Sequence, residues 1–433
     1  MLFRKKDPEV LVVGAGPVGM FSALCLSERG IDFRVVDQDV RPAAHSYALA
    51  LHPRSIEMLE SLGLEERELA AGRRVETIAF YDDTKWRASV RLTELPGVHP
   101  YLLVLRQSRI EQLLHGLLSD AHRKVEWTRR VSSVRMDDEG LQVTLDHLDK
   151  VSSGYAVSVP EWQVVHRRTM QPSFVVGADG TDSGVRNAFG ARTRDAGSPS
   201  VFAVFEFDSD YPLPHEMRVV LGEKAMSLLW PLPDGKVRWS FELPDATSPP
   251  AALREKSRYV MQTDPEHETA LGPEMLKRLL VERAPWFDTV PGEITWSTTV
   301  KFERKLATRF AGPRFGLCGD AAHVTGPAGV QSMNLGFAEA RDLVDRVARV
   351  LKDGASVDLL NEYDERWRQE WEFLSGVTGD LAPRRNTDAW VAWNRFRIRG
   401  CLPGWGDGYR LLAGQLGLDV KRETPAEISG RVD

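Results

Sequence analysis

Hydrophobic and polar positions divide the chain into short apolar runs and longer amphipathic stretches. Near the N-terminus, the run "VLVV" at residues 10–13 leads through a glycine-rich turn into an apolar segment, and a second short run, "FRVV", follows at residues 33–36. Short β-branched runs that alternate with a helical segment predict a βαβ unit with a parallel sheet. The pattern therefore predicts an α/β fold with a Rossmann-like beginning.

The middle of the chain follows a different pattern. In residues 237–243, Val, Trp, Phe and Leu alternate with Arg238, Ser240 and Glu242. This alternation predicts a half-buried strand of an antiparallel sheet, and the runs "VFAVFEF", "MSLLWPL" and "ITWSTTVKFERKL" are also β-rich. Helical spacing returns in residues 337–351 and 356–376. We therefore expect an antiparallel sheet inserted into the α/β fold, followed by helices.

The first of three glycine-bearing turns has the spacing of a dinucleotide-binding fingerprint. Gly14 permits the turn, Gly16 lets the backbone approach a pyrophosphate, and Gly19 lets the helix pack on the strand. Asp37 lies 18 positions after Gly19, where a carboxylate can accept hydrogen bonds from a ribose. These features predict that an adenosine-containing dinucleotide binds with its phosphates at the helix N-terminus. They do not distinguish FAD from NAD(P).

Two further strand-to-turn segments occur later in the chain. "FVVGADGTDSGVR" places Asp179, Ser183 and Arg186 across a turn, and "FGLCGDAAH" ends a strand near Asp320, before a loop and a helix. Either segment alone fits a turn with a capping aspartate. The three motifs in this order predict that the turns meet around one cofactor.

In these motifs the chain resembles the flavoprotein monooxygenases of the p-hydroxybenzoate hydroxylase type, the single-component aromatic hydroxylases. That family carries GxGxxG, then DGxxSxVR, then GD-A-A-H and a loop of proline and glycine that ends in asparagine. The resemblance covers roughly residues 8–350 and implies that FAD binds, with Asp320 at its ribityl or pyrophosphate part and residues 327–334 against the isoalloxazine ring. A helix that starts near Met333 then directs its positive dipole end toward the part of the ring that becomes negative on reduction. The residues assigned to the cofactor by fingerprint and resemblance are Gly14, Gly16, Pro17, Val18, Gly19, Asp37, Gln38, Arg41, Tyr47, Gln107, Asp179, Gly319, Asp320, Pro327, Gly329, Val330, Met333 and Asn334.

Some positions depart from the family pattern. Val330 and Ser332 replace two glycines of the loop, which predicts a stiffer loop or a slightly shifted flavin. Tyr47 stands where an arginine often touches FAD and helps the ring to swing, so the resemblance leaves that swing open; Arg41 could compensate, or Tyr47 could stack on a ring. His323 invites a catalytic role, but the resemblance favours a structural one.

The convergence of the motifs predicts a discontinuous FAD-binding domain of residues 1–74, 104–190 and 301–355. Residues 75–103 and 191–300 then form a substrate domain, and residues 356–433 form a C-terminal helical segment. The resemblance implies that the antiparallel sheet forms the floor of the substrate site. Some residues of this sheet are candidates to face an aromatic substrate, although core packing explains aromatic side chains at least as well. The substrate candidates are Phe205, Trp230, Pro231, Trp239 and Phe241.

Composition and charge narrow the partners. The chain has 433 residues, of which 42% are hydrophobic, and its formal net charge of −6 gives no positive field to hold nucleic acid. Cys25, Cys318 and Cys401 lack CxxC spacing and the ten histidines are scattered, so we expect neither disulfides nor a metal site, and a cytoplasmic location. Cys318 could be a reactive thiol or a buried apolar side chain. The uncharged stretch at residues 10–27 contains three glycines and a proline, so no membrane span is expected.

The resemblance implies an NAD(P)H-dependent monooxygenase. Hydride reduces FAD, O2 adds at C4a as a hydroperoxide, and the terminal oxygen passes to an aromatic or polyketide-like small molecule. No second GxGxxG occurs, so NADPH or NADH is expected to bind transiently. A phenolic substrate needs a base, for which Tyr101, Tyr211 and His215 are candidates because they lie in predicted substrate segments. The alternatives are a flavin reductase or dehydrogenase acting on an alkene or isoprenoid, a flavin-dependent halogenase, and a non-enzymatic FAD-binding scaffold. A homodimer is compatible with the sequence.

Overall fold

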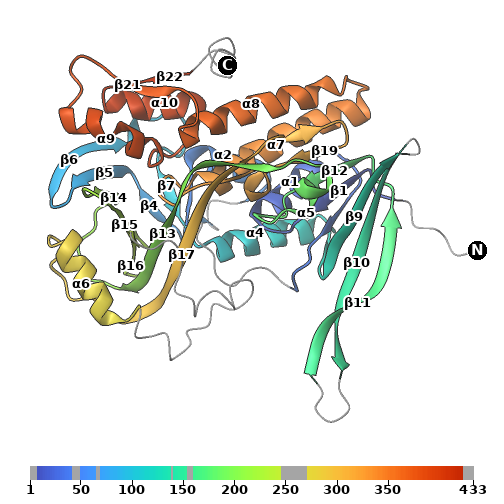
Figure 1. The fold of residues 1–433 in the computed structure, drawn as a ribbon, viewed down its shortest axis with the longest axis horizontal. Coiled ribbons are helices and arrows are strands. Elements are labelled where there is room, and N and C mark those ends of the chain that lie inside the picture. Colours follow the sequence, from blue (N-terminus) through green and yellow to red (C-terminus); the bar gives the residue numbers. More distant parts are fainter. Residues whose placement is uncertain are drawn as a thin grey trace, which may run out of the picture.

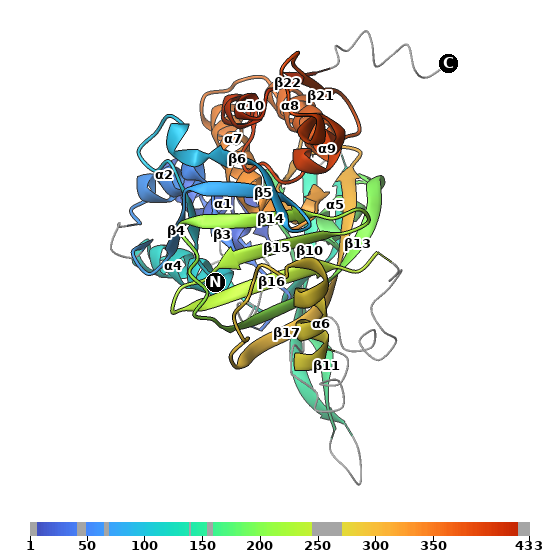
Figure 2. The same ribbon diagram turned by 90° about the vertical axis from the view of Figure 1, so that its left-hand side faces the viewer.

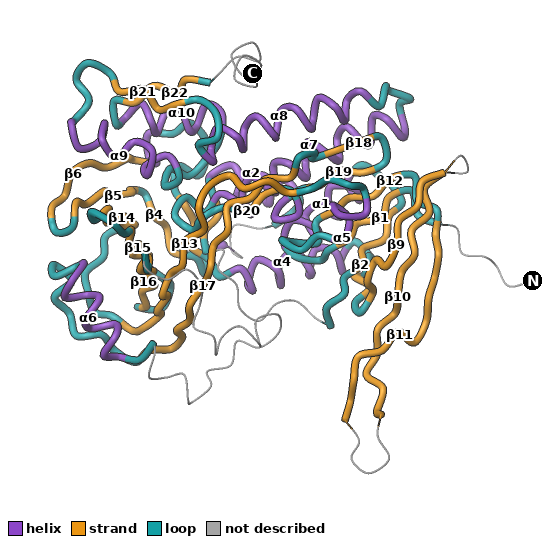
Figure 3. Tube along the Cα trace, viewed as in Figure 1, coloured by secondary structure: helices purple, strands orange, loops and turns teal. Residues whose placement is uncertain are grey.

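A computed structural model of the protein describes residues 7–40, 49–64, 69–137, 140–153, 159–244 and 271–422. Within these ranges the chain forms a six-stranded sheet, an eight-stranded sheet, three smaller sheets and a set of helices (Figure 1, Figure 3). The helices include α7 (Gln331–Lys352) and α8 (Asp358–Ser375), which pack side by side. Arg41 and Tyr47, two of the residues assigned to the cofactor, lie outside the described residues.

The six-stranded sheet has the order β18-β19-β12-β1-β2-β8. All neighbouring strands are parallel except the pair β18–β19, and β1 and β12 are apolar and buried along their whole length. Strands of this kind need cover on both faces. Helix α1 packs on β1 and contacts both α4 and α7. The bounds are β1 (Val10–Val13), α1 (Pro17–Glu28), β2 (Phe33–Val36), α4 (Gln107–Asp120), β8 (Val125–Glu126), β12 (Phe174–Gly177), β18 (Ala311–Gly312) and β19 (Phe315–Leu317).

The eight-stranded sheet has the order β20-β17-β13-β16-β15-β14-β5-β6, and its neighbouring strands are antiparallel except for β14 and β5 (Figure 2). On one face, helix α6 (Pro273–Arg283) packs with Leu276, Leu279 and Leu280 against apolar side chains of the sheet. The opposite face is turned toward the loop that precedes α7. The bounds are β5 (Thr77–Asp82), β6 (Lys85–Arg91), β13 (Thr193–Asp208), β14 (Glu216–Leu221), β15 (Met226–Pro231), β16 (Lys236–Glu242), β17 (Ile294–Ala307) and β20 (His323–Val324).

The remaining described elements surround these two sheets. An antiparallel sheet of β9, β10 and β11 projects from the body of the molecule (Figure 1, Figure 2). Two further small sheets pair β3 and β4 with β7, and β21 with β22. The bounds are β3 (Ala50–Leu51), α2 (Pro53–Ser61), β4 (Arg73–Val75), η1 (Leu92–Glu94), β7 (Leu102–Val104), β9 (Arg129–Asp137), β10 (Gly140–Ser153), β11 (Val159–Met170), α5 (Gly184–Ala188), η4 (Gly319–Ala321), β21 (Asp380–Pro383), α9 (Ala389–Arg399), α10 (Gly406–Gln415) and β22 (Leu418–Lys421).

The predicted fold class is confirmed: an α/β unit, an inserted antiparallel sheet and C-terminal helices are all present. The predicted domain boundary at residue 300 falls inside β17, which stays in the eight-stranded sheet to Ala307, and the division into domains stays a prediction. Among the described residues, no helix combines the length and the apolar character that crossing a bilayer requires.

Candidate active site

The three glycine-bearing turns meet at the carboxyl ends of β1, β12 and β19. A Cβ placed on Gly14 would lie 2.2 Å from the carbonyl oxygen of Ala178, the residue before Asp179. A Cβ on Gly319 would lie 3.0 Å from Cγ2 of Val18, so the third turn contacts the first. Gly14 and Gly319 both have positive φ values, of 103° and 63°, which glycine adopts without strain. The predicted convergence of the three motifs is therefore confirmed.

In the first turn, two of the glycines have different surroundings. A Cβ on Gly19 would lie 2.0 Å from the carbonyl oxygen of Gly14, so only glycine lets α1 approach the turn. A Cβ on Gly16 would meet no protein atom within 4 Å. Gly16 is the N-cap of α1, and no side chain caps this helix start. The backbone beside Gly16 is thus open to a ligand, and its helix end favours a negatively charged one.

Asp37 at the end of β2 organises the same turn. Its Oδ2 accepts a hydrogen bond from the backbone N–H of Ala15 at 2.6 Å, and its Oδ1 accepts one from the N–H of Asp39 at 2.8 Å. Burial raises the pKa of Asp37, while these two backbone hydrogen bonds act to lower it. The adjacent Gln38 is exposed, and its predicted contact with the cofactor stays a prediction.

The second turn is tied together by its own polar side chains. Asp179 accepts hydrogen bonds from the Ser183 hydroxyl at 2.5 Å and from the N–H of Val185 at 3.1 Å, and burial raises its pKa. Ser183 caps α5, and the guanidinium of Arg186 donates to the carbonyl oxygens of Ala321, at 2.9 Å, and Thr181, at 2.8 Å. Arg186 thereby connects the second turn to the third.

A buried carboxylate supports the third turn from behind. Glu339 of α7 is fully buried and accepts hydrogen bonds from the N–H of Gly319, at 2.9 Å, and from the indole of Trp371, at 2.5 Å. Its Oε2 also lies 2.9 Å from Nε2 of His323, whose ring stacks on Trp371 with centroids 3.7 Å apart. His323 is enclosed in this network, which fits the structural role that the resemblance favours.

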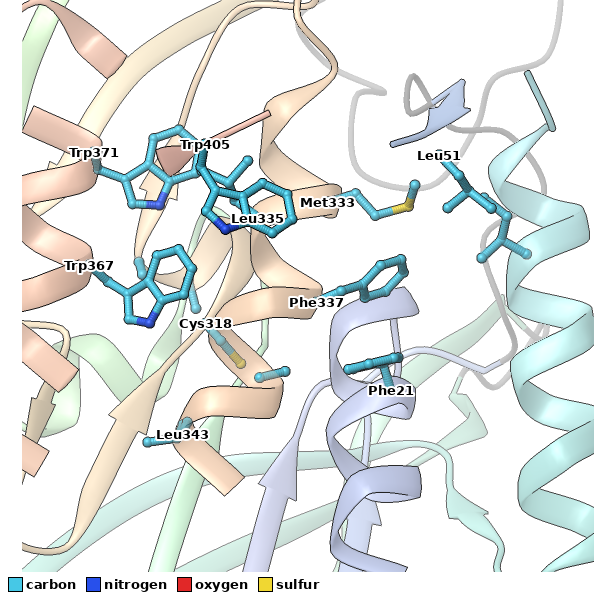
Figure 4. Close-up of a cluster of buried hydrophobic side chains, with 14 of the residues drawn as sticks. Phe21, Leu51, Cys318, Met333, Leu335, Phe337, Leu343, Trp367, Trp371 and Trp405 are labelled. Carbon is cyan, nitrogen blue, oxygen red and sulfur yellow. The ribbon is translucent and has the colours of Figure 1, made fainter. Parts of the chain in front are cut away.

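The hydrophobic packing behind the turns is continuous from α1 through α7 to α8. Figure 4 shows Phe21 beside Phe337, with ring centroids 4.8 Å apart, and Cys318 among the buried side chains. Burial raises the pKa of the Cys318 thiol well above its usual range, and Cys25 and Cys401 are buried as well. Of the two readings left open for Cys318, the structure favours the buried apolar side chain over the reactive thiol.

The loop at residues 327–334 is held on several sides. The side chain of Asn334 donates to the carbonyl oxygens of Ala50, at 2.9 Å, and Val330, at 2.7 Å, and accepts from the N–H of His52 at 2.7 Å. Nε2 of His52 lies 3.0 Å from the carbonyl oxygen of Gly329 and donates to it. His52 is fully buried, and this lowers its pKa to about 4, so the ring is neutral at physiological pH.

The loop also carries the start of α7 and a link to the third turn. Val330 is the N-cap, no side chain caps this helix start, and the first turn contains no acidic residue. The Ser332 hydroxyl donates a short hydrogen bond to Asp320. The positive end of α7 therefore lies beside the exposed Asp320 carboxylate and the predicted position of the ring.

A small cavity of about 20 Å³ lies between this loop and the eight-stranded sheet. The loop contributes Pro327 and Val330. The other lining residues are Leu49, Val204, Leu228, Trp230, Arg238, Ser240 and Phe302. A space of this volume holds about one water molecule, so an aromatic ring can enter only when side chains that line the cavity move.

The period of two along β16 decides which predicted substrate residues face this cavity. Arg238 and Ser240 line it, whereas Trp239 and Phe241 point to the other face and pack with α6. Phe205, which pairs with Trp239, lies in the same α6 cluster. The structure therefore does not place Phe205, Trp239 or Phe241 beside the cavity.

Of the remaining substrate candidates, Trp230 lines the cavity. Pro231 follows Trp230 at the end of β15 and is buried, but it is not among the lining residues.

The three candidate bases lie away from the cavity. Tyr101 hydrogen-bonds through its hydroxyl to Nδ1 of His99 at 3.0 Å. The ring of Tyr211 stacks on Phe287 on the α6 side of the sheet, and its hydroxyl accepts from Arg218 at 3.1 Å. His215 is exposed. None of the three lines the cavity, so the structure does not bring the predicted bases together with the predicted ring position.

The sequence analysis does not identify an ion pair, Arg238 with Glu206, on the face of the sheet that lines the cavity. Arg238 donates from Nε to Glu206 at 2.8 Å, and Arg106, which precedes α4, donates to the other oxygen of Glu206 at 3.0 Å. Arg238 also lies over the ring of Trp296, 5.4 Å from its centroid. The alternation of residues 237–243 contains the signal, but a half-buried strand is expected to expose its polar positions, whereas Arg238 and Ser240 are buried.

Gln107 begins α4 directly after Arg106, and its side chain donates to Glu111 at 2.7 Å. Its predicted contact with the cofactor, like that of Met333 at the start of α7, stays a prediction. Among the described residues, no group of three or more His, Cys, Asp or Glu side chains could hold a metal ion.

Comparison with known proteins supplies the family. The protein family described as "FAD binding domain" matches residues 7–373. The chain is 29% identical over 365 residues to 6-methylpretetramide 4-monooxygenase of Streptomyces rimosus, covering 82% of this chain and 58% of that protein. It is 26% identical over 389 residues to pentachlorophenol 4-monooxygenase of Sphingobium chlorophenolicum, covering 86% of this chain and 64% of that protein. The chain thus spans about three fifths of the length of these two relatives.

Among solved structures, p-nitrophenol 4-monooxygenase from Pseudomonas putida has a similar fold. The TM-score is 0.66 at 21% sequence identity, and the match covers 84% of this chain and 86% of that chain.

Proposed function

Because this chain belongs to the family of FAD-binding domains, we propose that it is an FAD-dependent monooxygenase that uses NAD(P)H and O2 to hydroxylate an aromatic or polyketide-like small molecule. The observation that carries the proposal is the meeting of three turns at one edge of the parallel sheet, next to a cavity lined by the antiparallel sheet. Two relatives, 6-methylpretetramide 4-monooxygenase and pentachlorophenol 4-monooxygenase, support the reaction class by their names.

The residues at the turns fit FAD. The open backbone beside Gly16 and the uncapped start of α1 suit a pyrophosphate, and the half-buried carboxylate of Asp37 suits a ribose hydroxyl. Asp320, at the uncapped start of α7, suits the polar chain between the phosphates and the ring. The loop at residues 327–334, with the uncapped start of α7, would lie against the ring of bound FAD. Bound FAD would supply the redox chemistry, which is hydride acceptance and oxygen activation.

The protein groups around the cavity position the substrate and exclude water. Leu228, Trp230 and Phe302 give apolar walls for a ring, while Arg238 and Ser240 offer hydrogen-bond donors to an oxygen substituent. The loop with Pro327 and Val330 closes the cavity on the side where we place the flavin ring. A dry site of this kind protects reactive species from water and fixes the substrate carbon to be oxidised.

Oxygen uptake tests this proposal. The protein, purified with FAD, should oxidise NADH or NADPH slowly alone and at least about tenfold faster with a suitable member of a panel of phenols and polycyclic quinones, and it should consume O2 in step. Reduction of an alkene under anaerobic conditions, without any substrate-dependent oxygen uptake, would instead identify a reductase. A flavin that no nicotinamide reduces would identify a binding scaffold.

A matched pair of variants checks the assignment of the cofactor site. Asp320→Ala should lose bound flavin, because this carboxylate stands at the predicted ribityl or pyrophosphate position. Asp353→Ala, at the exposed C-terminal end of α7, should retain flavin. Equal flavin content in the two purified variants would contradict the placement.

A further inference from the structure

Val330 combines two observations that the other loop residues do not. Its backbone is left-handed, with φ 43° and ψ 39°, and its side chain lines the cavity between the loop and the sheet. A positive φ is costly for a residue with a Cβ atom and most unfavourable for a β-branched one. Such a conformation persists only where the surroundings fix it.

The surroundings of Val330 do fix it, residue by residue. Gly329 accepts a hydrogen bond from buried His52, and the Gln331 side chain donates to the carbonyl oxygen of Leu402 at 3.1 Å. Further along, Asn334 donates back to the carbonyl oxygen of Val330 at 2.7 Å. With both neighbours and its own carbonyl held, Val330 cannot return to a right-handed conformation without breaking buried hydrogen bonds.

The loop also cannot withdraw from the cavity. A Cβ on Gly329 would lie 2.8 Å from the carbonyl oxygen of Gly400 and 3.2 Å from that of Leu402, so the backbone of the segment after α9 lies directly behind the loop. Across the cavity, the wall is the interior of a sheet, with Val204 and Trp230 buried. The side chain of Val330 therefore reduces the width of the cavity, and neither the loop nor the sheet can move apart easily to restore it.

We propose that Val330 is a specificity-determining residue, whose side chain limits the size of the aromatic ligand that fits between the loop and the eight-stranded sheet. This inference rests on the proposed function, since it assigns the cavity to the substrate. The isopropyl group of Val330 fills a position where glycine would leave the cavity open to the loop backbone. The substrate class that follows is a compact aromatic compound rather than an extended polycyclic one.

Ligand binding by the oxidised FAD-loaded protein tests the inference without any turnover. Phenol, naphthol and hydroxyanthraquinone, with one, two and three rings, serve as probes, and perturbation of the flavin absorption spectrum gives their dissociation constants. Val330→Gly should improve the affinity for the three-ring probe relative to phenol by about tenfold or more, the usual effect of admitting or excluding one small apolar group.

Two further variants separate the size of the side chain from relief of the backbone. Val330→Ala keeps the left-handed position and removes two methyl groups, so it should shift the preference in the same direction by a smaller factor. Thr128→Gly relieves a left-handed residue of φ 56° that does not line the cavity, and it should leave the preference unchanged.

The outcomes distinguish this inference from the proposed function. Substrate-stimulated oxygen uptake by the unmodified protein, together with an unchanged ring-size preference in Val330→Gly and Val330→Ala, would overturn the inference alone. A shifted preference without any oxygen uptake would support the size limit and contradict the monooxygenase. If the FAD-loaded protein bound none of the three probes, the assignment of the cavity to an aromatic ligand would be wrong.

Discussion

At the scale of single residues, the site depends on glycines that serve different purposes. Gly19 has no room for a side chain because the carbonyl oxygen of Gly14 lies against it. Gly16 has room, since no protein atom comes within 4 Å of the position of a Cβ. The fingerprint does not distinguish the two glycines, whereas the structure packs Gly19 against the first turn and leaves open space beside Gly16.

This difference predicts opposite results for two alanine variants. Gly16→Ala should fold with nearly unchanged stability in the absence of FAD and bind FAD at least about tenfold more weakly, because its methyl group would lie where the pyrophosphate approaches. Gly19→Ala should instead lower the unfolding temperature of the FAD-free protein, because α1 must move away from the turn. Thermal unfolding and FAD titration of both variants measure this, and two indistinguishable variants would contradict the division of roles.

The titration of His52 should make the free energy of unfolding depend on pH. Its pKa is about 4 in the folded protein and near 6.5 in an unfolded chain, so the unfolded state binds more protons between these values. Stability is fully present above about pH 6.5 and is lost as the pH falls toward 4, by up to roughly 3 kcal/mol. His52→Gln keeps a donor for Gly329 and removes the titration.

The measurement is the unfolding temperature at pH 5 and pH 7. The loss between pH 7 and pH 5 should be smaller in His52→Gln than in the unmodified protein. His215→Gln, which changes an exposed histidine, is the matched control and should retain the full loss. A loss in His52→Gln as large as in the control would show that His52 does not supply the dependence.

At the scale of elements, the three turns act as one unit because side chains join them. Arg186 reaches from α5 to the carbonyl oxygen of Ala321, and Glu339 reaches from α7 to the N–H of Gly319. The sequence placed each turn correctly, since the strand, glycine and helix signals are local. It could not show Glu339 as a support, because this residue lies within an amphipathic helix and only the fold brings it to Gly319.

The bridge formed by Arg186 is testable. Arg186→Met should leave the buried carbonyl oxygen of Ala321 without its donor, which costs about 1–3 kcal/mol, and it should weaken FAD binding together with stability. Arg192→Met, at an exposed position nearby in sequence, is the control. Circular dichroism melting and FAD titration measure both effects; unchanged FAD affinity in Arg186→Met would mean that the second turn is not coupled to the cofactor.

At the scale of the whole molecule, the parallel sheet carries the three turns that we assign to the cofactor, and the antiparallel sheet carries the cavity wall that we assign to the substrate. The sequence predicted both sheets and their order along the chain. It could not predict which face of β16 meets the cavity, because a period of two separates the faces without saying which one packs on α6. Trp239 and Phe241 are candidates for the substrate wall because they are aromatic, yet they pack on the α6 side, and Arg238 and Ser240 face the cavity. Nor does a sequence reveal that Val330 is left-handed, since valine alone argues against it.

The source of the oxygen in the product tests the central claim most directly. The FAD-loaded protein is supplied with NADH or NADPH, oxygen-18 gas and an aromatic substrate that stimulates oxygen uptake. The mass of the product is then measured by mass spectrometry. The proposed monooxygenase reaction predicts one labelled oxygen atom per product molecule. A product that carries no label, or a substrate that gains two hydrogens instead, would contradict it.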